Sequence, residues 1–126
     1  MDIRFTDREM DIMRVLWRLG PSTVAEVREA LPDDLAYNTV LTMLRLMEEK
    51  GQVHRSVEGR AHRYHPAVDR DTAGRSTLRR IADRLFEGSR EAVLLGLVES
   101  GEVEEGELRR MRDLLEERLR SVEEEQ

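Results

Sequence analysis

Two closely spaced signals for the start of a helix constrain the fold of this chain most. Thr6-Asp7-Arg8-Glu9 and Thr23-Val24-Ala25-Glu26 both have the form of a capping box. In such a box the threonine hydroxyl accepts a bond from the backbone three residues on, and the glutamate bonds back. Gly20-Pro21 ends the first helix, and Pro32-Asp33-Asp34 ends the second. The pattern predicts two short helices, one after each capping box.

A third helix and a hairpin extend this pattern. We predict the three helices over about 7–19, 23–31 and 36–50, the last of them ending at Gly51. The second and third of these helices are joined by a tight turn, and the third has a polar face, which together match a helix-turn-helix. Residues 53–57 and 61–65 are strand-like runs around Glu58-Gly59-Arg60, which predicts a β-hairpin. Three helices followed by a hairpin is the order of a winged helix.

The helical periodicity predicts which side chains pack inside. The expected core positions are Met10, Met13, Leu16 and Trp17 in the first helix and Val40, Met43, Leu44 and Met47 in the third. On the other side of the third helix, Asn38, Thr42 and Arg45 recur at i, i+4 and i+7, and Leu41 borders them. A recognition helix needs this division, because one side docks on its own domain and the other meets base edges.

The residue types on the exposed side suit DNA. Arginine can bond guanine with two hydrogen bonds, asparagine can do so with adenine, and the methyl groups of threonine or leucine can touch the thymine methyl. Residues at the start of the third helix and basic residues of the hairpin suit phosphates, which set register rather than sequence. The candidate DNA-binding residues are Tyr37, Asn38, Thr39, Leu41, Thr42, Arg45, Arg55, Arg60, His62 and Arg63.

The sequence predicts a separate helical region in the C-terminal part of the chain, after about residue 70. Residues 66–75 are polar and include Gly74, so we expect a linker there, followed by helices over about 76–86, 90–99 and 103–123. The expected fold is mainly α with a small β wing. Residues 1–70 would form a winged-helix DNA-binding domain, and residues 71–126 a three-helix dimerisation domain.

Self-association follows from the composition of that region. Aromatic residues make up only 4% of the chain, which is a thin core for a monomer of this length. The helix at 90–99 is too apolar to be exposed and too short to span a membrane. We expect it to lie between two subunits, although helices that fold back on the wing domain are the alternative. The candidate dimerisation residues are Leu78, Ile81, Leu85, Val93, Leu94, Leu97, Val98, Leu108, Met111 and Leu115.

The net charge of −6 at first argues against binding to nucleic acid, but the distribution of charge along the chain matters more than the sum. Residues 1–75 carry 12 basic and 13 acidic side chains, a balance of −1, and residues 76–126 carry 9 and 14, a balance of −5. The chain has no cysteine, which excludes disulfides and thiolate metal sites. We expect a cytoplasmic protein without membrane insertion, metal or cofactor.

Other classes of function remain to be weighed. His54, His62 and His65 are the obvious metal-ligand candidates, but His62 and His65 are three apart on one strand and so face opposite sides. Neither a carboxylate–histidine motif nor a glycine-rich phosphate loop accompanies them, so we expect no catalysis. A winged helix that binds a protein partner and a regulator that senses a small ligand both stay open.

Three stretches of the chain carry a resemblance to a known family. They are residues 5–17 (FTDREMDIMRVLW), 36–51 (AYNTVLTMLRLMEEKG) and 63–66 (RYHP). With them the chain resembles the penicillinase-repressor family, also called BlaI/MecI. The resemblance implies a homodimeric winged-helix repressor that binds inverted-repeat operator DNA. It also implies a membrane sensor metalloprotease as a partner, which leads to cleavage of the repressor in its C-terminal part.

The chain departs from the family pattern at the cleavage site. The β-lactam-responsive members are cut at an Asn-Phe bond in the fifth helix, where this chain has Gly96-Leu97. We therefore take Gly96 and Leu97 as the candidate cleavage region, and the β-lactam signal does not carry over. A copper-responsive branch ends in a cysteine motif, which this cysteine-free chain lacks.

Overall fold

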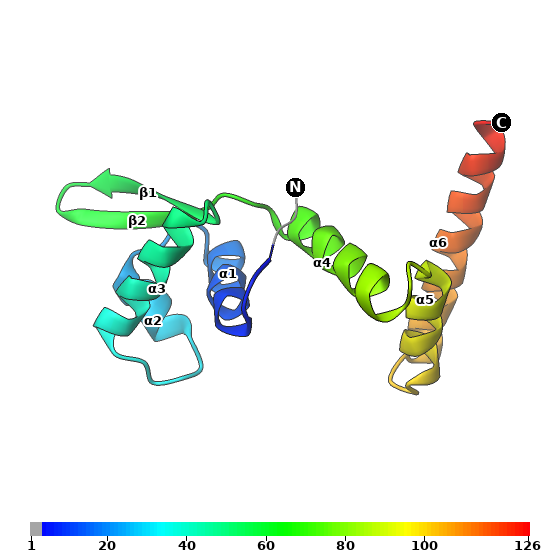
Figure 1. Cartoon of the computed structure of the whole chain (residues 1–126), viewed down its shortest axis with the longest axis horizontal. Coiled ribbons are helices and arrows are strands. Elements are labelled where there is room, and N and C mark those ends of the chain that lie inside the picture. The colour runs from blue at the N-terminus through cyan, green and yellow to red at the C-terminus, as the bar shows by residue number, and fades with distance from the viewer. Residues whose placement is uncertain (1–3) are drawn as a thin grey trace. The chain divides into compact units, whose positions relative to one another are not determined.

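The computed structural model describes residues 4–126 and contains the expected elements (Figure 1). In chain order they are α1 (Asp7–Leu19), α2 (Val24–Ala30), α3 (Tyr37–Glu49), β1 (Val53–Glu58), β2 (Ala61–Pro66), α4 (Arg70–Leu85), α5 (Arg90–Glu99) and α6 (Glu105–Glu124). The prediction of a mainly helical protein with a small β wing is confirmed.

Both predicted capping boxes are present. The Thr6 hydroxyl accepts a bond of 3.1 Å from the Glu9 amide, and the Thr6 amide donates at 2.9 Å to the Glu9 carboxylate. Thr23 and Glu26 repeat this arrangement at 3.2 and 3.0 Å. Each cap contributes about 0.5–2 kcal/mol to helix stability. These bonds explain why α1 and α2 begin where the sequence predicts.

The chain divides into two compact units, one ending at Leu78 and the other running from Arg79 to Gln126. The division falls inside α4, whereas we expected a domain boundary at residue 70. The first half of α4 is therefore part of the first unit.

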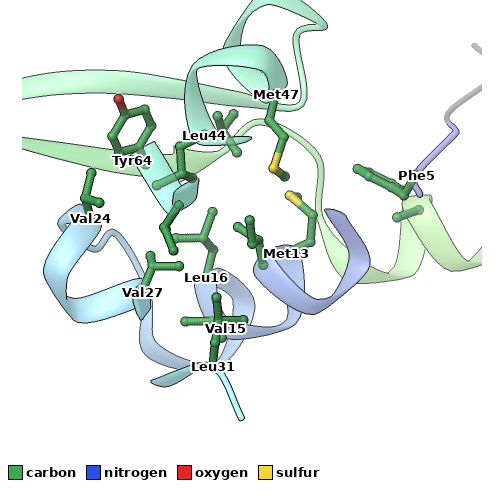
Figure 2. Packing of buried hydrophobic residues seen from close by; sticks show 14 residues of the cluster. Phe5, Met13, Val15, Leu16, Val24, Val27, Leu31, Leu44, Met47 and Tyr64 are labelled. Carbon is green, nitrogen blue, oxygen red and sulfur yellow. The ribbon is translucent and has the colours of Figure 1, made fainter. Parts of the chain in front are cut away.

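Side chains from α1, α2, α3 and the hairpin form the core of the first unit (Figure 2). Val40, Leu44 and Met47 of α3 are fully buried, as predicted, while Met43 is only partly buried. In α1 the expected face is shifted. Met13 and Leu16 are buried together with Ile12 and Val15, whereas Met10 and Trp17 lie partly buried at the edge.

The hairpin is held against the helices through its second strand. β1 and β2 pair antiparallel from Val53↔Pro66 to Glu58↔Ala61, around a turn in which Gly59 has a φ of 62°. Ser22, in the loop between α1 and α2, pairs with Tyr64 through two backbone bonds of 3.1 and 2.8 Å. This bridge attaches the hairpin to the start of α2.

The linker predicted over residues 66–75 is wrong, because α4 already begins at Arg70. The Asp69 carboxylate accepts a 2.7 Å bond from the Thr72 amide and so satisfies an otherwise free amide at the helix start. The Thr72 side chain and then this backbone amide, by hydrogen bonding to the carboxylate, lower the pKa of Asp69 below its ordinary value. Ala73 is buried against the core, which gives this first turn a packing partner. Gly74 lies inside the helix rather than in a linker.

The second unit contains the rest of α4 together with α5 and α6. Neither α5 nor α6 has a fully buried residue. Large apolar side chains are instead exposed along both helices, among them Leu97 at 55% and Leu114 at 65%. Within residues 4–126, no helix is both long and apolar enough to cross a membrane.

Candidate nucleic-acid interface

Helix α3 presents two distinct faces. Val40, Leu44 and Met47 point into the core, while Asn38, Thr42 and Arg45 are exposed to solvent. Leu41 is partly buried between the two faces. The division predicted from the sequence is therefore present, with the polar side available to a partner.

A groove runs along this exposed side, between α3, the start of α2 and the tip of the hairpin. Its volume is about 290 Å³. The residues that line it are Thr23, Val24, Ala25, Tyr37, Leu41, Arg45, Arg60, Ala61, His62 and Tyr64. The fold thus brings Tyr37, Leu41 and Arg45 of α3 together with Arg60 and His62 of the hairpin. Asn38, Thr39 and Thr42 are exposed on α3 outside the groove lining.

Tyr64 is a lining residue that the sequence pattern did not single out as part of the site. Its side chain is fully buried, and its hydroxyl has no hydrogen-bond partner among the described residues. A buried hydroxyl without a partner loses its hydration, at about 1–3 kcal/mol. An aromatic residue at a strand position that faces the core was the signal for its burial.

The four arginines of the candidate site differ in their surroundings. Across residues 4–126, neither Arg45 nor Arg60 has an ion pair. The Arg55 Nε lies 3.7 Å from the Glu48 carboxylate, and its Nη1 lies 3.3 Å from His62 Nδ1. Positive charge without an internal partner is therefore concentrated at Arg45 and Arg60.

Arg63 is held within the first unit. Its Nε donates at 2.7 Å to Glu58, and its Nη1 donates at 3.0 Å to Glu26 and at 3.3 Å to the Pro21 carbonyl. Bonds from the Thr23 backbone and hydroxyl lower the pKa of Glu26, and the nearby Arg63 lowers it further. The same carboxylate therefore caps α2 and anchors the hairpin.

Comparison with known proteins identifies the family. The sequence profile described as "Penicillinase repressor" matches residues 5–117. The chain belongs to the penicillinase repressor family. It is 42% identical over 101 residues to "Transcriptional regulator BlaI" of Mycobacterium tuberculosis, in an alignment that covers 76% of this chain and 72% of that protein. Membership makes the chain a transcriptional repressor rather than an enzyme, as the sequence predicted.

Two solved structures resemble this penicillinase-repressor chain. One is the solution structure of the monomeric form of Bacillus licheniformis BlaI in complex with the blaP half-operator. It has 27% identity and a TM-score of 0.50, and the match covers 57% of this chain and 90% of that one. A MarR family protein from Bacillus stearothermophilus, with 20% identity and a TM-score of 0.52 over 98% of this chain and 76% of that one, shares the fold alone.

In this penicillinase repressor a charged contact fixes the end of α3. The Lys50 ammonium lies 2.7 Å from the buried Glu9 carboxylate, which also accepts a 3.5 Å bond from the Gln52 amide. Burial raises the pKa of Glu9, but the bonds from Lys50, Thr6 and Gln52 outweigh it, and the net pKa is lowered. This contact joins α1 to the turn between α3 and the hairpin.

The histidines of this family member lie on the hairpin. His54 and His65 are cross-strand partners whose rings stack at 4.7 Å, and His65 Nε2 lies 2.7 Å from the Ser56 hydroxyl. His62 pairs with Val57, three positions along the strand from His65, so it faces the opposite side from His65, as predicted. Among the described residues, no group of three side chains could hold a metal ion.

The candidate dimerisation residues of this repressor are mostly exposed on the single chain. Ile81, Val93, Leu94 and Met111 are half-buried. The exposed members are Leu78, Leu85, Leu97, Val98, Leu108 and Leu115. The candidate cleavage region, Gly96 and Leu97, is exposed within α5.

Proposed function

We propose that the chain binds inverted-repeat operator DNA as a homodimer, with the exposed side of α3 in the major groove and the hairpin on the phosphate backbone. The observation that carries this proposal is the groove in which Arg45 and Arg60, two arginines without ion pairs, lie beside exposed polar residues of α3. The similarity to a BlaI chain in complex with a half-operator supports it.

The arginines are proposed to have separate roles. Arg45 lies on α3 with Asn38 and Thr42 and would contact base edges, whereas Arg60 at the hairpin tip would contact phosphate. Arg55 and Arg63 are weaker candidates for phosphate contact because carboxylates within the chain already neutralise them. We assign Arg63 chiefly to holding the hairpin in place.

The test compares Arg45→Ala with Arg60→Ala by fluorescence anisotropy on the native promoter and on a scrambled duplex. Arg45→Ala should lose about 1–3 kcal/mol of discrimination between the two duplexes. Arg60→Ala should weaken both complexes alike and reduce the slope of log K against log salt by about one. Arg18 of α1, an exposed arginine outside the groove, provides the matched control. Unchanged affinity in Arg45→Ala would refute the role of α3, and a flat salt response would favour a protein partner.

Dimerisation is assigned to the second unit. The leucines exposed on α5 and α6 give an apolar surface that a second copy could cover. Two linked winged helices double the base contacts and fix the spacing of the half-sites. Repression would follow from the dimer covering promoter DNA.

Release is proposed to follow a cut in the C-terminal region by a membrane sensor metalloprotease. Gly96 and Leu97 lie within a regular helix, so α5 must open locally before a protease can reach the bond. A chain ending at Gly96 would lack α6 and should neither dimerise nor bind the full operator tightly. Sedimentation and anisotropy of this truncation test the idea, and a truncated dimer with full affinity would contradict it.

A further inference from the structure

A pocket of about 560 Å³ opens between α1 and the first half of α4, wholly inside the first unit. Its apolar lining includes Phe5, Met10, Trp17 and Leu78. This volume lies within the range of about 300–1,000 Å³ that is common for small-molecule sites. The groove next to α3 is a different hollow and shares no lining residue with it.

Trp17 presents an apolar, fixed surface to this pocket. Its Nε1 donates at 2.8 Å to the Val68 carbonyl, so its one polar atom is already satisfied. The Phe5 ring packs edge-on at 6.5 Å between ring centroids. An aromatic or aliphatic group could therefore pack on the indole without leaving a polar atom unpaired.

Two arginines give the pocket a positive charge. The Arg70 guanidinium lies 5.8 Å from the centroid of the Trp17 ring, and Arg14 has no ion pair among the described residues. Among residues 4–126, no aspartate or glutamate lines the pocket, although the chain as a whole has a net charge of −6. Arginine can bind a carboxylate through two parallel hydrogen bonds.

We propose that this pocket binds a small amphipathic anion, with its apolar body on Trp17 and its acidic group at Arg14 and Arg70. A second copy of the chain is assigned instead to the apolar side chains exposed on α5 and α6, which lie outside the first unit. The site does not depend on the DNA-binding proposal. Because α4 continues beyond Leu78 into the second unit, a bound anion would act on the helix that joins the two units.

The test uses 2-naphthoate as the probe and naphthalene-2-methanol as its neutral analogue. Trp17 is the only tryptophan, so its indole N–H gives a single resonance in a ¹⁵N-resolved NMR spectrum. Naphthoate should shift this resonance saturably, and calorimetry should give at least about tenfold weaker binding for the alcohol, which corresponds to about 1.4 kcal/mol. Equal affinity for the two compounds, or no shift at Trp17, would overturn the proposal.

Variants at Gly74 and Arg14 separate the ligand from other occupants. Gly74 lines the pocket, and a Cβ built there meets nothing within 4 Å, so Gly74→Leu should fill the space and abolish naphthoate binding. Gly74→Ala, which adds one methyl group, is the matched control and should retain it. Arg14→Gln should weaken naphthoate but not the alcohol. Full naphthoate binding by Gly74→Leu would overturn the proposal. A weaker dimer of Gly74→Leu in sedimentation would also overturn it, because a second copy of the chain would then occupy the pocket.

Discussion

The two units of this repressor differ in how completely their apolar side chains are buried within a single chain. In the first unit, α1, α2, α3 and the hairpin enclose fully buried side chains such as Met13, Leu16 and Leu44 (Figure 2). In the second, α5 and α6 have none, and leucines remain exposed along both. The difference shows that the first unit has a core of its own, whereas α5 and α6 leave much of their apolar surface uncovered in a single chain.

The largest effect is expected in the core of the first unit. Leu44→Ala removes a fully buried side chain and should lower the free energy of unfolding by about 2–5 kcal/mol. Leu46→Ala, two positions along the same helix, is the control because that side chain is 50% exposed, and its effect should be small. Urea unfolding measures both. Similar losses for the two variants would contradict the burial pattern of α3.

A charge in the second unit should change self-association instead. Leu94→Asp places a carboxylate at a half-buried position of α5, and burying this charge between subunits would be costly. We expect monomers in sedimentation and at least about a tenfold weaker dimer, or about 1.4 kcal/mol. The unfolding of the first unit should be unaffected. A dimer of normal affinity would show that α5 lies outside the interface.

Acid should weaken the first unit through Glu9. The pKa of Glu9 is lowered from 4.5 in the folded state, so the unfolded chain binds the proton more readily. The stabilisation is present above that value and is lost as the pH falls below it. Glu9→Gln should flatten the pH dependence of urea unfolding in this window, and Lys50→Met, which removes the partner, should flatten it as well. A slope that both variants leave unchanged would mean that the contact contributes nothing.

The smallest effect is expected at the end of α4, in the second unit. Glu87 has a φ of 51°, the left-handed region that favours glycine, and the Gly88 amide closes the helix on the Ala82 carbonyl at 2.8 Å. Glu87→Gly should relieve the backbone strain and raise stability by up to about 1 kcal/mol. Thermal unfolding measures the change, with Glu91→Gly inside α5 as the destabilising counterpart. A loss of stability in Glu87→Gly would show that its side chain matters more than its φ.

Local signals in the sequence predicted most of the first unit. Capping boxes and periodicity gave α1, α2 and α3 to within a residue or so, because these signals act over only a few positions. The start of α4 was missed because residues 66–75 are polar. The packing of Ala73 and the bond from Thr72 to Asp69 favour a helix that begins at Arg70, within this polar stretch.

By itself, the sequence determined the order of the elements, the two faces of α3 and the family. Only the tertiary structure distinguished the arginines, because their partners come from segments far apart in the chain. Arg63 and Glu26 are separated by 37 residues, and the hairpin brings them within 3.0 Å. Arg45 and Arg60 keep their charges free because no carboxylate of the described chain reaches them. The sequence gives the residue types, but the pairing of charges depends on distances between side chains, which only the tertiary structure determines.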